Sequence, residues 1–455
     1  MARLPLRAES IVAGAMSTIV AAAVFAVACA PSSRMGAASA RPASGVQQAV
    51  SGGGTRNELH GRLDGIDRYA RIALATGVTV APISSTTRWR VDEQGGTQPL
   101  VKGSGTEPWR IERKGGLLRI AGEGDDATPW RRGPFVVRTT ATDGMLKYNG
   151  HRYRGELWFT ATDVGILVVN RIAVEDYLKG VVPTELGTRL VTDRAAMEAQ
   201  AIAARSYAYM RVPSAEAVQQ TGAYDMVATV QNQVYLGADT EHPVVNQAVD
   251  ATAGLVLRYG GLLVDAPYSA SCGGRSAVPT DAWRDARSQP YLQAVDDLDP
   301  ASGKPFCDLS PRNHWTAELD ETQLNEAVRR ALVATGANAP KPTVVREVEV
   351  AGRTASGRVG ELLLRTERGD VRIRANDVRG VLRDVRGAIL FSTYFSIDRE
   401  ARNHGHLTGI TLRGAGNGHG VGMCQWGAIG RARAGQDART ILAHYYPGTV
   451  VSFAD

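Results

Sequence analysis

Two segments far apart in the sequence carry residue types that could do chemistry together. The first segment, residues 174–186, ends close to the carboxylic acid Glu185. The second, residues 416–428, is a glycine-rich run that contains His419 and Gln425. A lone acid beside a polar, backbone-lined groove is what cleavage of a polymer such as a glycan needs. We therefore treat the two segments as one candidate site.

Glu185 lies where the sequence predicts a break between two elements. It follows Val181-Val182-Pro183, which indicates an apolar strand end interrupted by proline, and it precedes a loop at Gly187. A carboxylic acid partly shielded by apolar residues has a raised pKa, as a general acid requires.

The glycine run admits two interpretations. Glycine at every second position from 416 to 422 removes side chains from one face of an extended segment, so that either a ligand or another backbone can approach. The polar residues His419 and Gln425 favour a ligand groove over a packed internal crossing. The glycine spacing excludes a dinucleotide fingerprint and a phosphate-binding P-loop.

Composition and motif spacing exclude several classes of partner. The net charge of +6 over 455 residues is mildly basic, and no Lys/Arg-rich block or zinc-finger spacing suggests nucleic acid. His404-x-His406 with His419 lacks the ligand spacing of a metal site. We expect no metal and no cofactor.

The N-terminus has the pattern of an export signal. Arg3 and Arg7 precede an apolar run over residues 11–28, and Cys29 follows it directly. This arrangement predicts a lipoprotein signal over residues 1–29 with Cys29 lipidated, although Ala26 stands where leucine is commoner. An uncleaved membrane anchor and plain secretion are the alternatives. In each case we expect an extracytoplasmic protein of the cell envelope.

Three further cysteines remain, an odd number. We predict a Cys272–Cys307 disulfide, since an oxidising envelope permits one and both residues lie in loop-like sequence. Cys424 would then be a free thiol, either a nucleophile or, as we favour, a small residue that fills a tight turn.

The remaining pattern predicts an α+β fold with a substrate groove. A flexible linker over residues 30–60 precedes a β-rich part over 61–170, which includes a hairpin with an Asn149-Gly150 turn. A mixed α+β catalytic core is expected over 171–455. Its predicted helices run from a cap at Asp193 to about Met210, over 321–334 and over 438–446. Its predicted strands cover 255–259, 262–268, 344–350, 361–366 and 371–374.

Several motifs in chain order resemble the stage II sporulation protein D (SpoIID) family, which includes the LytB amidase enhancers. The matching segments are 153–157, 174–185, 198–208, 271–276, 418–423 and 444–449. The resemblance covers roughly residues 65 to 453, and its motifs are long and specific. Cys424 and Trp426 stand where Ser and Tyr are usual, and Cys272 replaces a small polar residue.

The resemblance implies a peptidoglycan-acting protein, in sporulation or in vegetative wall remodelling. The family's catalytic glutamate falls on Glu185. Residues implied to bind substrate are Gln200, Arg205 and Tyr207 on the alanine-rich helix, with His419 and Gln425 in the glycine run. Arg205 is expected to orient Glu185 through an intervening group, or to bind substrate, since a close arginine would lower the pKa of the acid.

Three functions remain open at this point. The first is a lytic transglycosylase that cleaves glycan strands lacking stem peptides, in which Glu185 alone serves as acid and base and the product is a 1,6-anhydro-muramyl end. The second is a non-catalytic peptidoglycan-binding enhancer of an N-acetylmuramoyl-L-alanine amidase. The third is a structural protein tethered to the wall.

Overall fold

The computed structural model describes residues 68–124, 126–187, 189–212, 222–334 and 343–454. The predicted signal, linker and lipidated Cys29 lie outside these residues. In the part of the chain that is described, no helix has the length and apolar character that crossing a membrane requires.

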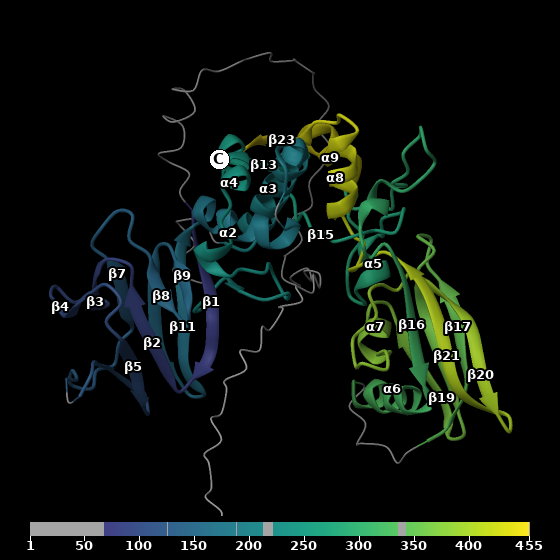
Figure 1. The fold of residues 1–455 in the computed structure, drawn as a ribbon, viewed down its shortest axis with the longest axis horizontal. Coiled ribbons are helices and arrows are strands. Elements are labelled where there is room, and N and C mark those ends of the chain that lie inside the picture. The colour runs from purple at the N-terminus through teal and green to yellow at the C-terminus, as the bar shows by residue number, and fades with distance from the viewer. Residues whose placement is uncertain (1–67, 125, 188, 213–221, 335–342, 455) are drawn as a thin grey trace, which may run out of the picture.

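The first part of the described chain is built of two β-sheets around an apolar core (Figure 1), antiparallel except for the β1–β12 pair. One sheet has the order β12-β1-β11-β10-β7-β3-β4 and the other β6-β5-β2-β8-β9. The strands are β1 (Tyr69–Val78), β2 (Val80–Ser85), β3 (Arg88–Glu93), β4 (Pro99–Ser104), β5 (Trp109–Lys114), β6 (Leu117–Ala121), β7 (Phe135–Thr139), β8 (Leu146–Tyr148), β9 (His151–Tyr153), β10 (Glu156–Thr162), β11 (Gly165–Ala173) and β12 (Met226–Val227).

The hairpin predicted in this part is present. Strands β8 and β9 pair antiparallel, with Tyr148 opposite His151. The two turn residues both have positive φ, 49° at Asn149 and 83° at Gly150. A two-residue turn of this handedness matches the twist of the strands, which is why the Asn-Gly pair predicted it correctly.

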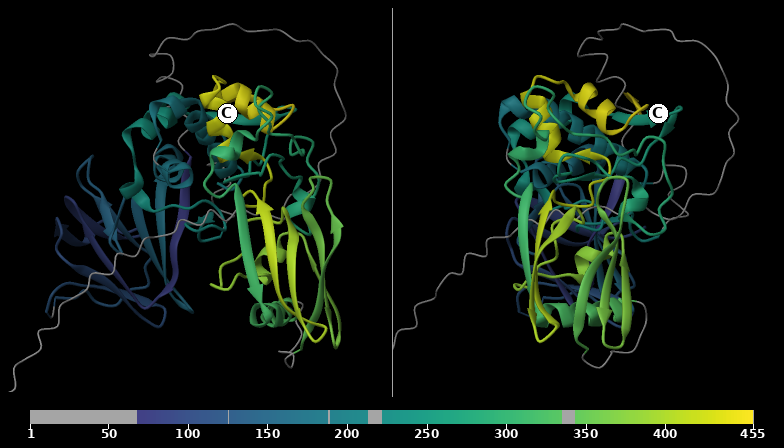
Figure 2. Two further views of the ribbon diagram at one scale, coloured as in Figure 1. Left: turned by 45° about the vertical axis from the view of Figure 1, so that its right-hand side comes forward. Right: turned by 90° about the vertical axis from the view of Figure 1, so that its right-hand side faces the viewer.

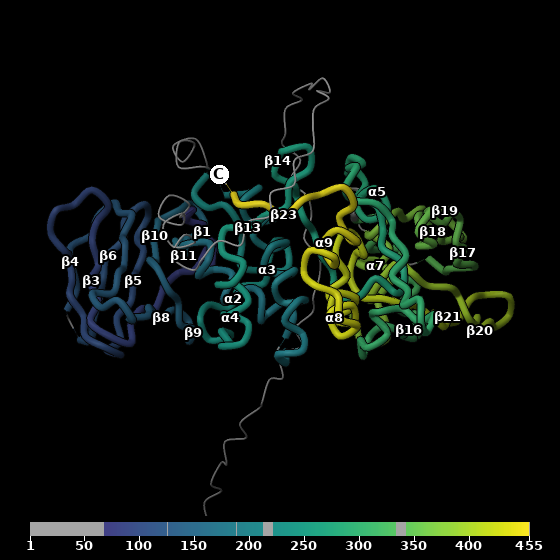
Figure 3. Tube along the Cα trace, turned by 90° about the horizontal axis from the view of Figure 1, so that it is seen from above, coloured from purple at the N-terminus to yellow at the C-terminus, as the bar shows by residue number. Residues whose placement is uncertain are grey.

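A helical part follows and lies between the β-rich part and a third region (Figure 3). Its helix α3 contacts α2, α4, α8 and α9, so it lies at the centre of this part. The helices are α2 (Val174–Leu186), α3 (Arg194–Tyr209), α4 (Pro243–Ala251), α5 (Pro279–Ala282), α8 (Gln425–Arg433) and α9 (Ala438–Tyr445). The short strands are β13 (Leu255–Tyr259), β14 (Leu262–Leu263), β15 (Tyr268–Ser269), β22 (Met423–Cys424) and β23 (Val450–Phe453).

Residues 314–415 form the third region, which we call the inserted unit (Figure 2). It has its own apolar core and two three-stranded sheets, β16-β21-β20 and β17-β18-β19. The sequence pattern did not distinguish it from the rest of residues 171–455. Its elements are β16 (His314–Asp320), α6 (Glu321–Ala334), β17 (Val345–Arg353), β18 (Val359–Thr366), β19 (Gly369–Arg374), α7 (Asp377–Val381), β20 (Phe395–Asn403) and β21 (His406–Ala415).

The α+β class is confirmed, with local corrections in the helical part. The predicted strand over 262–268 is present only at its two ends, as β14 and the first residue of β15. The helix predicted after Asp193 is present as α3, but the Asp193 carboxylate accepts from Arg433 at 2.7 and 3.1 Å rather than capping the helix.

Candidate functional site

Glu185 lies on the last turn of α2, not at a strand end. The buried residues of α2 recur at three- and four-residue spacing, as in Val174, Leu178 and Val181, which is the period of a helix packed on one side. Pro183 lies inside this helix, and close to its end a proline removes one backbone hydrogen bond without ending the element. The predicted strand over Val181-Val182-Pro183 is therefore wrong, because the buried helical stripe outweighs the local proline signal.

Two neutral N–H groups hold the carboxylate of Glu185. The backbone N–H of Val234 donates to Oε1 at 3.1 Å, and the side-chain amide of Gln425 donates to Oε2 at 3.3 Å. Val234 comes from a loop that carried no recognisable motif, so sequence reasoning missed it. The carboxylate thus has defined partners that place no full positive charge against it.

This surrounding raises the pKa of Glu185 to about 6, because burial disfavours the charged carboxylate. The hydrogen bonds from Val234 and Gln425 act in the opposite direction but are smaller effects. A carboxylic acid with a pKa near 6 is in part protonated near neutral pH, so it can donate a proton and later accept one.

Gln200 and Gln425 meet beside Glu185. Gln200 is fully buried on α3 and Gln425 is 2 % exposed at the first position of α8. The Gln425 amide lies 3.5 Å from the carbonyl oxygen of the Gln200 side chain, at the limit of a hydrogen bond. The structure therefore brings three of the predicted site residues together from α2, α3 and α8.

Arg205 points to a different acid. Its guanidinium is fully buried and donates to both oxygens of Glu175, at 2.7 and 2.8 Å, and to the carbonyl of Leu255 at 3.0 Å. An arginine held in this way links α3 to the start of α2 and to β13. These contacts indicate a role in stabilising the fold.

Tyr207 is also buried, behind the site. Its hydroxyl accepts from Asn232 at 3.3 Å, and the guanidinium of Arg211 stacks on its ring at 3.2 Å from the centroid. The hydroxyl and the ring of Tyr207 therefore both contact neighbouring residues of the fold.

The glycine run is a packed internal crossing. All four alternating glycines have φ between 71° and 106°, and the run packs against residues 267–273. A Cβ at Gly422 would lie 2.0 Å from the carbonyl oxygen of Pro267. His419, 2 % exposed, packs against Trp283 and accepts from the backbone N–H of Val421 at 2.8 Å. Burial, with smaller effects from neighbouring arginines, lowers the pKa of His419 to about 3, so the ring is neutral. These contacts favour the packed crossing over the groove interpretation of the run.

A partly exposed edge at the end of α2 is formed by Trp426 and Arg189. The Arg189 guanidinium stacks over the Trp426 ring, 4.7 Å from its centroid, and Arg189 also donates to the carbonyl of Leu186 at 2.6 Å. Trp426 is partly exposed and follows Gln425 directly. Sequence position could have indicated this pair, because Arg189 follows Glu185 by four residues and Trp426 follows Gln425 by one.

The predicted Cys272–Cys307 disulfide is not formed in the structure. The two sulfur atoms lie 3.8 Å apart, against about 2.05 Å for a disulfide bond. All three cysteines that the structure describes are free and buried. They gather with Asp297, and their donor atoms and one carboxylate oxygen lie within 4.8 Å of one another.

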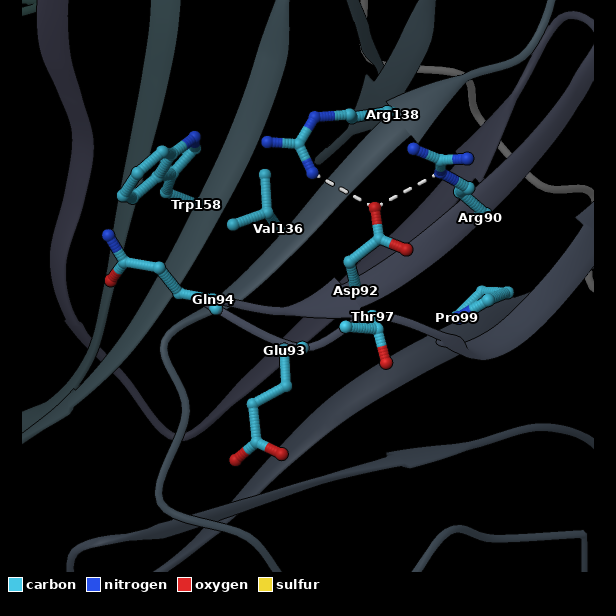
Figure 4. A pocket seen from close by; sticks show the side chains of 11 residues that line it. Arg90, Asp92, Glu93, Gln94, Thr97, Pro99, Val136, Arg138 and Trp158 are labelled. Carbon is cyan, nitrogen blue, oxygen red and sulfur yellow. Dashed lines mark hydrogen bonds and ion pairs between the residues drawn. The ribbon is translucent and has the colours of Figure 1, made fainter.

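A polar pocket in the β-rich part lies away from the predicted site residues (Figure 4). Its floor carries Asp92, which accepts from Arg90 at 3.0 Å and from Arg138 at 2.9 Å. Trp158 stands at its side. Both acids of the pocket are paired with arginine, Asp92 as above and Glu93 with Arg131 at 3.2 Å, so neither has the neutral environment of Glu185.

Comparison with known proteins identifies the family. The model described as Stage II sporulation protein (SpoIID) matches residues 162–259, which include α2 and α3. An uncharacterised protein of Brachyspira hyodysenteriae is 31 % identical over 308 residues, which cover 68 % of this chain and 74 % of that protein. The chain belongs to the SpoIID family. A second model, described as a domain of unknown function (DUF8618), matches residues 308–422, the inserted unit with its flanks.

The chain is also similar to two named proteins of Bacillus subtilis. The Amidase enhancer is 30 % identical, with 60 % of this chain and 40 % of that protein covered. Stage II sporulation protein D is 26 % identical, with 63 % and 76 % covered. The chain thus spans less than half the length of the amidase enhancer.

Proposed function

We propose that this SpoIID-family protein is a lytic transglycosylase that cleaves peptidoglycan glycan strands lacking stem peptides, in cell-wall remodelling outside the cytoplasm. The observation that carries the proposal is the environment of Glu185, whose carboxylate is held by two neutral N–H donors and has a pKa of about 6. Such an acid suits proton transfer to a leaving oxygen and back.

The reaction needs one acid in two roles. Protonated Glu185 gives its proton to the glycosidic oxygen as the bond from the muramyl C1 to that oxygen breaks. The C6 hydroxyl of the same sugar then attacks C1 and gives its proton to the Glu185 carboxylate. A 1,6-anhydro-muramyl end forms and Glu185 is again protonated, so that no water is consumed.

The neighbouring acids support a mechanism with one carboxylic acid. A glycosidase of the usual type has two carboxylates flanking the scissile bond. Near α2 and α3, Glu175 is paired with Arg205 and Asp193 with Arg433, each through two hydrogen bonds. Acids held in this way stabilise the fold and are poorly suited to act as a base, which leaves the sugar hydroxyl as the nucleophile.

The substrate contact that we propose is the Trp426–Arg189 edge. An aromatic face that is partly exposed can pack against the apolar face of a sugar ring, while an arginine binds its oxygens. Gln425 and Gln200 are proposed to position Glu185, since both are buried and in contact with it or with each other. His419, Arg205 and Tyr207 have partners in the fold and are assigned no substrate contact.

The test uses purified full-length protein and glycan strands freed of stem peptides by an amidase. Mass spectrometry should detect 1,6-anhydro-muramyl ends with wild-type protein and lose them with Glu185→Gln. The control is Glu326→Gln, which removes a surface glutamate paired with Arg329 on α6. Absence of anhydro ends with wild-type protein would refute the enzyme proposal. Activity retained in Glu185→Gln would refute the role of that residue alone.

A second function is favoured by one specific observation, the 30 % identity to a protein named Amidase enhancer. In this alternative the protein binds peptidoglycan and stimulates an N-acetylmuramoyl-L-alanine amidase without cleaving glycan. Release of stem peptides by a purified amidase, with and without this protein, distinguishes the two. Acceleration that persists in Glu185→Gln, with no anhydro ends, would favour the enhancer.

We also propose that Cys29 is lipidated and anchors the protein to the membrane. Expression of wild type and Cys29→Ala in the native host, followed by fractionation, tests this. The anchor predicts wild-type protein in the membrane fraction and the variant outside it. A variant that stays in the membrane would favour the uncleaved anchor.

A further inference from the structure

Four fully buried side chains from four separate segments converge at the base of the inserted unit. They are Cys272, Asp297, Cys307 and Cys424, and we call them the Cys3Asp cluster. Cys272 Sγ lies 3.8 Å from Cys307 Sγ and 3.4 Å from Asp297 Oδ2. Free cysteines are often buried singly, but here three thiols converge on one buried carboxylate, which is the arrangement of a metal-ligand set.

We propose that the Cys3Asp cluster binds one zinc ion in a closed structural site. Zinc in proteins is tetrahedral, with bonds of about 2.3 Å to sulfur and 2.0–2.2 Å to carboxylate oxygen. Two sulfurs on such an ion are about 3.8 Å apart, which is the separation of Cys272 and Cys307. Three thiolates favour a soft ion such as zinc over magnesium or calcium, and four protein ligands leave no open position.

Hydrogen-bond donors surround the sulfur and carboxylate atoms of the cluster. The backbone N–H groups of Cys272 and Gly427 donate to Cys424 Sγ at 3.1 and 3.2 Å. The Tyr445 hydroxyl donates to Asp297 Oδ2 at 2.8 Å, and Arg431 donates to Oδ1 at 2.9 Å. Donors of this kind stabilise a thiolate and fix the orientation of a metal-bound carboxylate.

Gly427 allows the first turn of α8 to pack closely against Asp297 and Tyr445. A Cβ at Gly427 would lie 2.1 Å from Asp297 Oδ2 and 2.1 Å from the hydroxyl oxygen of Tyr445. The cluster therefore uses a residue without a side chain where the helix crosses it.

Charge balance supports the ion. Three thiolates, one carboxylate and Zn²⁺ carry a net charge of about −2. Two buried arginines adjoin the cluster, Arg431 on Asp297 and Arg358, which donates to the carbonyl of Cys272 at 2.8 Å. Arg358 is 1 % exposed, and its Nε and Nη1 have no hydrogen-bond partner among the described residues. A buried cation left in this state is costly, and an anionic zinc–thiolate centre would offset it.

The location gives the ion a structural role. Cys307 lies just before, and Cys424 just after, the 308–422 region matched by the second family model. The ion would therefore tie together the two chain ends from which the inserted unit leaves and returns. Cys424 also directly precedes Gln425, which contacts Glu185. The zinc site does not depend on the proposed activity. It replaces the sequence expectation of no metal, which rested on the absence of metal-ligand spacing among the histidines and cysteines.

The test is metal content of untagged full-length protein purified without chelator. We expect one zinc per chain by mass spectrometry of the elements. Cobalt substitution should give the strong thiolate-to-cobalt absorption and the visible bands of a tetrahedral site. In Cys424→Ser and in Asp297→Asn, the zinc content per chain should fall below about a tenth of the wild-type value. The control Asp296→Asn, an exposed neighbour paired with Arg275, should keep its zinc.

Measurements on the wild type keep the proposal open to refutation even where a variant does not fold. Wild-type protein without zinc and without the cobalt spectrum would overturn it, whether peptide mapping then shows free thiols or a Cys272–Cys307 disulfide. Zinc retained in the triple variant Cys272→Ser, Cys307→Ser, Cys424→Ser would also overturn it.

Discussion

The side-chain amide of Gln425 donates to the carboxylate of Glu185 at 3.3 Å, although the two residues are 240 positions apart. This contact joins the end of α2 to the start of α8, on either side of the entire inserted unit. It is the structural reason to regard the two sequence segments as one site.

Glu185→Gln should make the protein more stable at pH 8. The native pKa of Glu185 is about 6, against 4.5 for the ordinary group, so its stabilising contribution is full below pH 4.5 and lost as the pH rises through 6. The glutamine does not titrate, so the variant gains at most about 2 kcal/mol, less after screening of a partly exposed side chain. Urea unfolding at pH 4 and pH 8 measures this, and an equal difference at both would contradict it.

Gln425→Leu should shift the pH dependence of glycan cleavage. The amide hydrogen bond lowers the pKa of Glu185, so its loss raises that pKa. The decline of kcat/KM on the alkaline side should then move to higher pH. Gln293→Leu, on an exposed loop, is the control. An unchanged profile in Gln425→Leu would show that the contact does not tune the acid.

Trp426→Ala should weaken binding to glycan strands by about 2–10-fold, the range expected for loss of one aromatic contact. Trp426→Tyr keeps an aromatic face and should bind nearly as wild type. Co-sedimentation with insoluble peptidoglycan measures both. Equal retention of the alanine variant would remove this edge from the proposed substrate site.

Arg205→Ala should lower the free energy of unfolding. Removal of one partner from a buried ion pair costs about 3–5 kcal/mol, and the Glu175 carboxylate would lose its cation. Arg194→Ala on the same helix removes an exposed pair with Glu198 and should cost about 0.3–0.5 kcal/mol. Denaturant unfolding compares them. A folded Arg205→Ala protein of normal stability with reduced glycan affinity would restore its assignment as a substrate residue.

Gly422→Ala should destabilise more than Gly435→Ala. Both glycines have positive φ, 71° and 86°, which costs an alanine about 1–2 kcal/mol. A Cβ at Gly435 meets open space, whereas at Gly422 it meets the Pro267 carbonyl, which adds about 1–3 kcal/mol. Thermal unfolding checks the order. Equal melting temperatures would argue against the packed crossing.

Local signals predicted several elements correctly. Asn149-Gly150 fixed a hairpin because both turn residues adopt positive φ. The alanine-rich stretch after Asp193 formed α3, since its apolar positions follow the helical period. The helix over 321–334 was likewise found with its bounds.

Sequence patterns that are compatible with two different structures were less informative. Pro183 suggested the end of a strand, but a buried helical stripe holds it inside α2. The alternating glycines fitted either a ligand or a backbone, and the neighbouring segment 267–273 fills the space. Arg205 looked like a partner for Glu185, yet Glu175 is the acid that packs against it.

The sequence by itself determined the class of fold, the family and the residue types available for chemistry, because periodicity, turn residues and motif order are local properties of the chain. Only the tertiary structure decided which groups meet. Glu185 gains its raised pKa from burial. The Cys3Asp cluster brings together Cys272 and Cys424, which are 152 positions apart in the chain. Such encounters depend on how helices and loops pack, which no spacing along the sequence encodes.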